Sequence, residues 1–447
     1  MPFGQRLLNP ILTRTLRHPV MQELFHYRHE WWRQLRGKPQ QVVVWLRFTD
    51  PYSYLLIQTL PDFITHFDVK LIFKFLPYQE PDQFFSYYLR DAWHLAQFHQ
   101  LQFHHFHAPS EEQCFIASQL LIANRHLPTD EFLILAKQVF LCLWEHQHQK
   151  LAMLSLRFQN LAASSTQKKL KQAQILFESQ QFRKAAMLQF HRSYYWGIDE
   201  LPLLAKRLEQ LNDDQSGHPF CLNQDQHQST QHYLINDWQQ LAQIRSQKYE
   251  LDFYFNFQDP LSYIYLIATH HLTEHYQIKL NLRPIYLEED SRQHGQDLSF
   301  EELTHLQELA QSYQLQINPS YILSTQGLTH CFALFYLALV QEKTPQITQH
   351  ILTSIWTDNK DLSYLPHLQS LLADLGYNNK QFKELLKQQA WHGMIEHNTN
   401  QWLQLDLPEL PSFYLQGEKR ISVCGAHRLW ALEMALIEQF NNQNPLK

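Results

Sequence analysis

The chain has 447 residues, which favours two or three domains, and its content of 44% hydrophobic, 14% aromatic and 18% charged residues is that of a folded globular protein. The formal net charge is −6, so the chain as a whole carries no electrostatic signature of nucleic-acid binding. Its closest glycines, Gly417 and Gly425, stand eight positions apart, which excludes the closely spaced glycines of a dinucleotide fingerprint or a phosphate-binding loop.

The cysteines are few and far apart. They stand at positions 114, 142, 221, 331 and 424, so the closest pair is 28 residues apart and cannot form a Cys-x-x-Cys redox pair or a zinc knuckle. An odd, sparse count is typical of a reducing compartment. The start of the chain has no apolar stretch of signal-peptide length, and residues 331–340 are the longest clean apolar run. We therefore expect a cytoplasmic protein without a membrane span.

Residues 1–40 are predicted to form a basic, helical N-terminal extension. They hold seven Lys or Arg residues against Glu23 and Glu30, a local charge of +5, with leucines at helical spacing. Such a segment could touch anionic lipid or RNA. We favour a helical arm that packs on its own protein or on a second copy, so a homodimer is the protein partner considered.

The first half of the remaining chain opens with a short apolar strand at residues 42–48. Asp50-Pro51 follows and predicts a helix start, because Asp accepts hydrogen bonds from free amides and Pro suits the first helical position. A second strand is predicted at residues 69–76. The long stretch from about 85 to 195 has helical periodicity and few breakers, so we interpret it as an all-helical insertion.

The second half repeats this order. A strand is predicted at residues 251–257, a helix start at Asp259-Pro260, a strand at 278–282 and a helical block from about 299 to 402. The offset from Asp50 to Asp259 is 209, LAQFHQLQF answers LAQSYQLQI at offset 214, and GIDELP (197–202) answers DLPELP (406–411) at 209. The repeat predicts one domain at 41–247 and another at 248–447.

Several motifs of the second half resemble one family. FYFNFQDPLSYIYL (253–266) and LPELPSFYLQGEKRISVCGAHRL (407–429) resemble the kappa-class glutathione transferases and the 2-hydroxychromene-2-carboxylate isomerases. The resemblance implies an α/β fold of two tandem DsbA-like thioredoxin domains, each with an all-helical insertion. It also implies a glutathione-linked isomerase or transferase without dithiol redox chemistry. The alternative is a catalytically degenerate tandem thioredoxin-fold binding protein.

The candidate catalytic residues are Asp50 and Asp259, which stand where the family has Ser or Cys beside the glutathione sulfur. At a helix N-terminus we expect both to be ionised near pH 7. Such a carboxylate would oppose a thiolate, so helix capping is favoured over a role as general base.

The resemblance also implies ligand-binding positions. It places a cis proline at Leu410-Pro411, repeated at Leu201-Pro202, and it aligns Gly425, Ala426, His427 and Arg428 with the family's Gly-Ser-Asp-Arg turn for the γ-glutamyl group. The hydroxyl and the carboxylate of that turn are missing here, which puts the usual glutathione contacts in doubt.

The first helical turns offer the remaining candidates for ligand binding, namely Tyr52, Ser53, Ser262 and Tyr263. The expected ligand is a small molecule or a thiol, with glutathione as the candidate cofactor and with no nucleotide and no nucleic acid. A metal site is not favoured, because neither His104, His105 and His107 nor the helical pair His271 and His275 has a recognisable further ligand. Trp144 and Trp356, equivalent in the repeat, are interpreted as core residues.

Overall fold

The computed structural model describes residues 40–104, 106–180, 182–211, 220, 222, 233–246, 249–287, 300–317, 323–417 and 420–443. The chain divides into two compact units, residues 1–227 and 228–447, and each has a four-stranded sheet of its own. The predicted N-terminal extension lies outside the described residues except for Gln40, which opens the first strand.

The sheet of the first unit has the strand order β2-β1-β3-β4. β1 pairs in parallel with β2 and in antiparallel with β3, and β4 is antiparallel to β3. Val42, Val44 and Leu46 are fully buried at every second position of β1, which puts them on one face of the sheet. The strands are β1 (Gln40–Leu46), β2 (Val69–Phe75), β3 (Met187–Phe190) and β4 (Ser193–Trp196).

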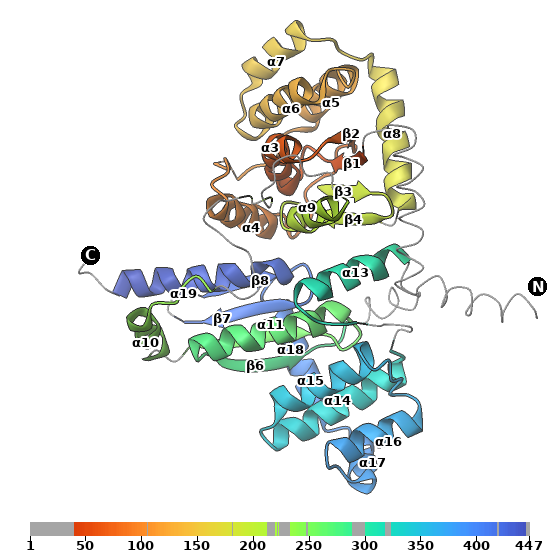
Figure 1. The fold of residues 1–447 in the computed structure, drawn as a ribbon, viewed down its shortest axis with the longest axis vertical. Coiled ribbons are helices and arrows are strands. Elements are labelled where there is room, and N and C mark those ends of the chain that lie inside the picture. The colour runs from red at the N-terminus through yellow and green to blue at the C-terminus, as the bar shows by residue number, and fades with distance from the viewer. Residues whose placement is uncertain are drawn as a thin grey trace, which may run out of the picture. The chain divides into compact units, whose positions relative to one another are not determined.

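The helices of the first unit fill the connection from β2 to β3 and flank the sheet. In Figure 1, α5, α6 and α7 form a group on one side of the strands, and α8 runs along the flank of the unit. The helical block predicted to reach residue 195 ends at Ser179, because the chain then pairs with β1 as the β3–β4 hairpin. The helices are α3 (Pro51–His66), α4 (Phe85–Phe98), α5 (Glu111–Ala123), α6 (Thr129–Trp144), α7 (His148–Arg157), α8 (Ala163–Ser179) and α9 (Leu201–Gln210).

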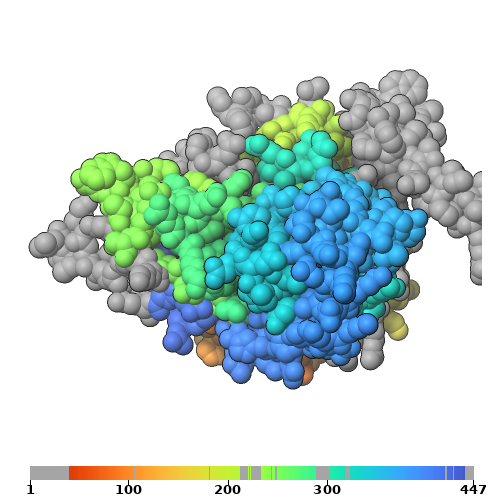
Figure 2. Space-filling model, turned by 90° about the horizontal axis from the view of Figure 1, so that it is seen from below, coloured from red at the N-terminus to blue at the C-terminus, as the bar shows by residue number. Residues whose placement is uncertain are grey.

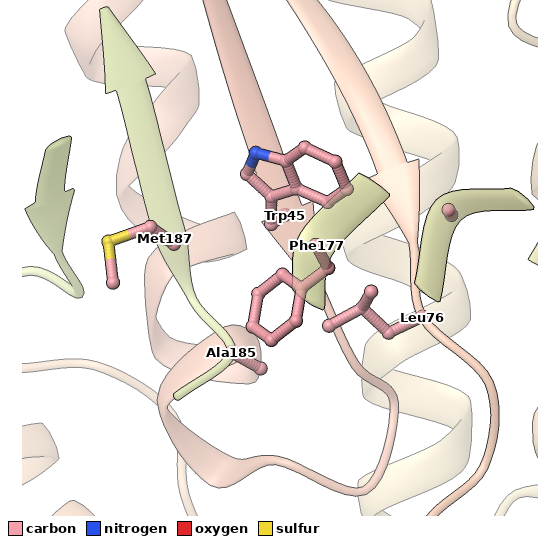
Figure 3. Close-up of a cluster of buried hydrophobic side chains, with 6 residues drawn as sticks. Trp45, Leu76, Phe177, Ala185 and Met187 are labelled. Carbon is pink, nitrogen blue, oxygen red and sulfur yellow. The ribbon is translucent and has the colours of Figure 1, made fainter. Parts of the chain in front are cut away.

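A cluster of buried side chains packs α8 against the sheet. Trp45 of β1 packs on Phe177 of α8 with ring centroids 5.7 Å apart, and Leu76, Ala185 and Met187 complete the contact, as Figure 3 shows. Trp45 and Leu76 precede the helical insertion, whereas Phe177 ends it and Met187 follows it. The cluster therefore packs the end of the insertion against the strands on either side of it in the sequence.

The sheet of the second unit has the order β6-β5-β7-β8, with the same parallel and antiparallel pairings in the same places. Leu251, Phe253 and Phe255 of β5 are fully buried, and Phe253 stacks on Phe413 of β7 with centroids 5.1 Å apart. The strands are β5 (Glu250–Phe255), β6 (Lys279–Pro284), β7 (Ser412–Gln416) and β8 (Ile421–Cys424).

Helices α14 to α17 of the second unit gather away from its sheet (Figure 1), and they dominate the surface in Figure 2, in cyan and blue. The predicted helical block to residue 402 agrees with α18, which ends at Leu403. The helices are α10 (Trp238–Ser246), α11 (Pro260–Tyr276), α13 (Phe300–Ser312), α14 (Thr325–Val340), α15 (Thr344–Trp356), α16 (Leu365–Asp374), α17 (Asn379–Gln388), α18 (Trp391–Leu403), the 3₁₀ helix η1 (Ala426–Arg428) and α19 (Leu429–Gln443).

Residues 233–246, here called the docking segment, precede the domain boundary expected at 247 yet pack on the second unit. α10 contacts α11 and α19. The buried carboxylate of Glu433 on α19 accepts hydrogen bonds from the Leu234 amide at 2.9 Å and from the Tyr276 hydroxyl at 2.7 Å. Tyr233 stacks on His275 with centroids 3.9 Å apart. The docking segment is thus held by hydrogen bonds as well as by packing.

Candidate functional site

Both predicted helix starts are observed, and the aspartate at each is the N-cap residue. α3 begins after Asp50, whose Oδ2 accepts from the Ser53 amide at 2.8 Å and from the Ser53 hydroxyl at 2.6 Å. α11 begins after Asp259, whose oxygens accept from the Leu261 and Ser262 amides, both at 3.0 Å, and from the Ser262 hydroxyl at 2.8 Å. The carboxylates therefore cap the helices and are engaged by their own first turns.

The electrostatics of Asp50 differ from the expectation based on the helix N-terminus alone. Burial raises the pKa of Asp50 above its usual range, while its hydrogen bonds from Ser53 and the charge of Arg47 act in the opposite direction. Desolvation is the larger effect, and it depends on packing that the sequence does not display.

The serines and tyrosines of the first turns are buried. Ser53 and Ser262 have no exposed surface, and both serve the caps. The Tyr52 hydroxyl donates to Asp91 at 2.8 Å, and the Tyr263 hydroxyl accepts from Thr357 at 3.1 Å. These four predicted ligand-binding residues therefore point into the packed structure.

The Leu410–Pro411 peptide bond is cis, as the resemblance implies. Because β7 runs antiparallel to β5 with Ser412 opposite Tyr254, this peptide lies beside the end of β5 from which the chain turns into α11. The Pro411 carbonyl accepts from the Gly425 amide at 2.9 Å. Leu410 is half-buried, and among the described residues neither its amide nor its carbonyl has a hydrogen-bond partner.

The prediction that Leu201-Pro202 repeats the cis-proline position is wrong. Leu201 and Pro202 open α9, after β4, whereas Pro411 precedes β7. The residue equivalent to Pro411 is Ala186, because the Ala186 carbonyl accepts from the Gly197 amide at 2.8 Å just as Pro411 does from Gly425. Ala186 has a trans bond and a φ of +57°. The proline match in the sequence was a coincidence of spacing.

In the first unit, the backbone carbonyl at the corresponding position has a hydrogen-bond partner. The Ala185 carbonyl, at the position of Leu410, accepts from the Trp196 ring nitrogen at 3.1 Å. Trp196 packs on Tyr52 with centroids 4.8 Å apart, and the Lys184 ammonium lies 4.6 Å from the centre of the Trp196 ring. Trp196 and Ala186 are not among the candidates predicted from the sequence. The signal for them is Gly197, which directly follows Trp196 and corresponds to Gly425 of the second unit.

The turn after β8 is built from Gly425 and η1. Gly425 has a φ of +79°, which favours glycine, and a Cβ there would lie 3.5 Å from a carboxylate oxygen of Glu409. Arg428 is only 2% exposed, and its guanidinium donates to the His427 carbonyl at 3.4 Å. Arg428 is therefore part of the packed turn.

No group of three His, Cys, Asp or Glu side chains in the described part of the chain could hold a metal ion. His104 pairs with Glu145 at 3.0 Å, His275 contacts the Ile235 carbonyl at 2.9 Å, and His105 lies outside the described residues. No helix among the described residues is long and apolar enough to cross a membrane.

The described cysteines, Cys114, Cys142, Cys331 and Cys424, are buried, and no two of them form a disulfide with each other. Burial raises the pKa of Cys114 to about 12 and that of Cys331 well above its usual range. Neither is a thiolate near neutral pH, so neither suits a redox nucleophile. Trp144 and Trp356 are each 1% exposed, in agreement with their interpretation as core residues.

Comparison with known protein families finds a match in the second unit. Residues 250–437 match the family model of the DSBA-like thioredoxin domain. The second unit thus contains a DsbA-like thioredoxin domain, to which the docking segment is an N-terminal addition.

No curated protein matches the chain. Among solved structures, it is similar to a 2-hydroxychromene-2-carboxylate isomerase at 20% identity and a TM-score of 0.36, over 44% of this chain and 99% of that one. It is also similar to the cytosolic disulfide reductase DsbM from Pseudomonas aeruginosa at 13% identity and a TM-score of 0.34, over 44% of this chain and 100% of that one.

Proposed function

We propose that the second unit is a binding domain for an extended, thiol-bearing peptide, of which glutathione is the smallest representative. The half-buried Leu410 carries the proposal, because its amide and carbonyl have no hydrogen-bond partner among the described residues and it lies just before β7, beside the end of β5 that leads into α11. An extended peptide beside Leu410 would supply an acceptor and a donor, as an added strand does at a sheet edge.

The chemistry at the helix start favours binding over redox turnover. The residue there is Asp259, and three donors of its own helix turn occupy its oxygens. A carboxylate about 4 Å from a ligand thiolate opposes it by about 1 kcal/mol in water and about 4 kcal/mol at intermediate dielectric. The ligand would therefore bind as a thiol or a thioether. A cytoplasmic location suits such a ligand and the buried cysteines of the described residues.

A glutathione-linked isomerase or transferase is the second candidate. The match of residues 250–437 to the DSBA-like thioredoxin family supports it. It would require a group other than the capped Asp259 to activate the ligand sulfur.

We further propose that the two units are a tandem repeat of one thioredoxin-like fold. Support comes from their equal strand order and their aspartate-capped first helices. The turn bonds from Gly197 to Ala186 and from Gly425 to Pro411 are also equivalent.

Calorimetry with glutathione and S-methylglutathione tests the binding proposal. We expect the parent protein to prefer S-methylglutathione as the pH approaches the thiol pKa. Asp259→Ser keeps a capping side chain and removes the charge, so it should tighten glutathione binding in that range. Asp50→Ser, the matched change in the first unit, should leave both affinities unchanged. Absence of binding of either ligand at millimolar concentration would contradict the proposal.

A further inference from the structure

The stretch of the first unit that forms α7 and most of α8 carries positive charge and no negative charge. Between Glu145 and Glu178 the sequence has no Asp or Glu, although the whole chain has a net charge of −6. The cations of this stretch are all exposed, and none forms an ion pair or a side-chain hydrogen bond with a described residue. They are Lys150 and Arg157 on α7 and Lys168, Lys169 and Lys171 on α8.

Large aliphatic side chains stand exposed on the same two helices. On α7, Leu156 is 90% exposed and Met153 is 67% exposed, and both lie on the side of the helix opposite to the buried Leu151. On α8, Ile175 and Leu176 are also exposed, although the next residue along the chain is buried. Single exposed aliphatic residues are common on proteins, but here they accompany the cations on two consecutive helices.

The two helices are held together at α5, which contacts both of them. Their connection is fixed by backbone bonds, because the Leu161 amide donates to the Gln119 carbonyl at 3.1 Å and the Asn124 side chain donates to the Gln159 carbonyl at 2.8 Å. In Figure 1, α7 lies at the end of the unit away from the strands, and α8 begins at that end. The exposed cations and aliphatic residues of α7 and α8, here called the α7–α8 face, therefore form a preformed surface.

The acidic residues of the neighbouring helices do not neutralise this surface by direct pairing. They stand in the first turns of α5 and α6, and none of them forms an ion pair with a cation of the α7–α8 face. These residues are Glu111, Glu112, Asp130 and Glu131.

We propose that the α7–α8 face docks on an anionic lipid bilayer, with Leu156 and Met153 inserted among the headgroups. Helices that combine lysines with exposed aliphatic residues are suited to this interface, because the long lysine stem keeps the ammonium group beside the headgroups. Protein interfaces are instead depleted in Lys and enriched in aromatic residues, and single-stranded nucleic acids stack on aromatic rings. Four of the five cations here are Lys, and the exposed large apolar residues of α7 and α8 are all aliphatic.

Co-sedimentation of the full chain with lipid vesicles tests the proposal. We expect at least tenfold tighter binding to vesicles with about 30 mol% phosphatidylserine than to pure phosphatidylcholine, and loss of most of this difference at about 0.5 M salt. Replacing two lysines together, Lys168→Gln with Lys171→Gln, should weaken binding at least tenfold, because each lysine near an anionic surface contributes about fivefold. The matched control, Arg90→Gln with Lys206→Gln, removes two exposed cations from α4 and α9 and should bind like the parent.

A second pair of changes tests the aliphatic contact. Met153→Gln with Leu156→Gln keeps the charge and should weaken binding to the anionic vesicles at least threefold, whereas Leu403→Gln, an exposed leucine of the second unit, should not. All these side chains are exposed, so the urea unfolding midpoint should stay unchanged in each variant.

Three results would overturn the proposal. The first is equal binding to both kinds of vesicle. The second is parent-like binding of the lysine pair, which would place the lipid contact elsewhere, as on the basic residues 1–40. The third is parent-like binding of the glutamine pair at Met153 and Leu156, which would indicate a purely electrostatic surface for an acidic protein or RNA.

Discussion

Removing the Glu433 carboxylate should release the docking segment. In Glu433→Ala the fully buried Tyr276 hydroxyl loses its acceptor, which costs about 1–3 kcal/mol, and the Leu234 amide loses a partly buried hydrogen bond worth about 0.5–1.5 kcal/mol. Burial and the charge of Glu433 raise the pKa of Tyr276, so its hydroxyl stays protonated and needs an acceptor. We expect the second unit to lose about 2–4 kcal/mol of unfolding free energy, since both losses concern one site and are not fully additive.

The same carboxylate predicts a pH dependence. Burial raises the pKa of Glu433 in the folded protein, so its contribution to stability is fully present below the unfolded pKa and is lost as the pH rises to the folded pKa. In that window the folded state binds more protons than the unfolded state, and the slope is at most about 1.4 kcal/mol per pH unit. Glu433→Gln keeps an acceptor for both donors and cannot titrate, so it should remove this slope.

Hydrogen exchange of residues 233–246 and urea unfolding, both on the full chain, measure these effects. Faster exchange confined to the docking segment in the alanine variant is expected, with little change in the glutamine variant. Wild-type exchange rates in Glu433→Ala, or an unchanged pH slope in Glu433→Gln, would refute the reasoning.

Further outcomes follow from the caps, the core and the cysteines. Asp259→Ala should cost about 1 kcal/mol in urea unfolding and Asp259→Asn clearly less, because Asn also caps; equal losses would contradict the capping role. Trp45→Ala should destabilise the first unit by about 3–5 kcal/mol by emptying its contact with Phe177, and an unchanged unfolding midpoint would contradict the importance of this cluster. Insulin reduction should stay at background, because both helix starts carry Asp; turnover abolished by replacing a single cysteine would overturn this expectation.

The sequence predicted those parts of the fold that depend on local signals. Asp50-Pro51 and Asp259-Pro260 cap helices at the expected residues because an N-cap needs only its own first turn. The motif LAQ-x-x-QLQ ends a helix in both units, where the Leu101 amide bonds to Ala96 and the Leu315 amide bonds to Ala310.

Alignment of the later strands was wrong because the helical insertions differ in length. Asp50 and Asp259 are 209 residues apart, whereas Met187 and Ser412, which open β3 and β7, are 225 apart. A constant offset therefore matched Pro202 with Pro411 although they lie in different elements. The raised pKa of Asp50 could not be predicted either, because it comes from burial by side chains of distant segments.

The two units differ in backbone pairing at the same end of similar sheets. Among the described residues the Leu410 carbonyl of the second unit has no partner, whereas in the first unit the equivalent Ala185 carbonyl accepts a hydrogen bond from the Trp196 ring nitrogen. The first unit therefore does not offer an extended peptide the same backbone acceptor. A ligand that pairs with this carbonyl should bind the second unit rather than the first, so a change at Asp259 should alter its affinity whereas the matched change at Asp50 should not.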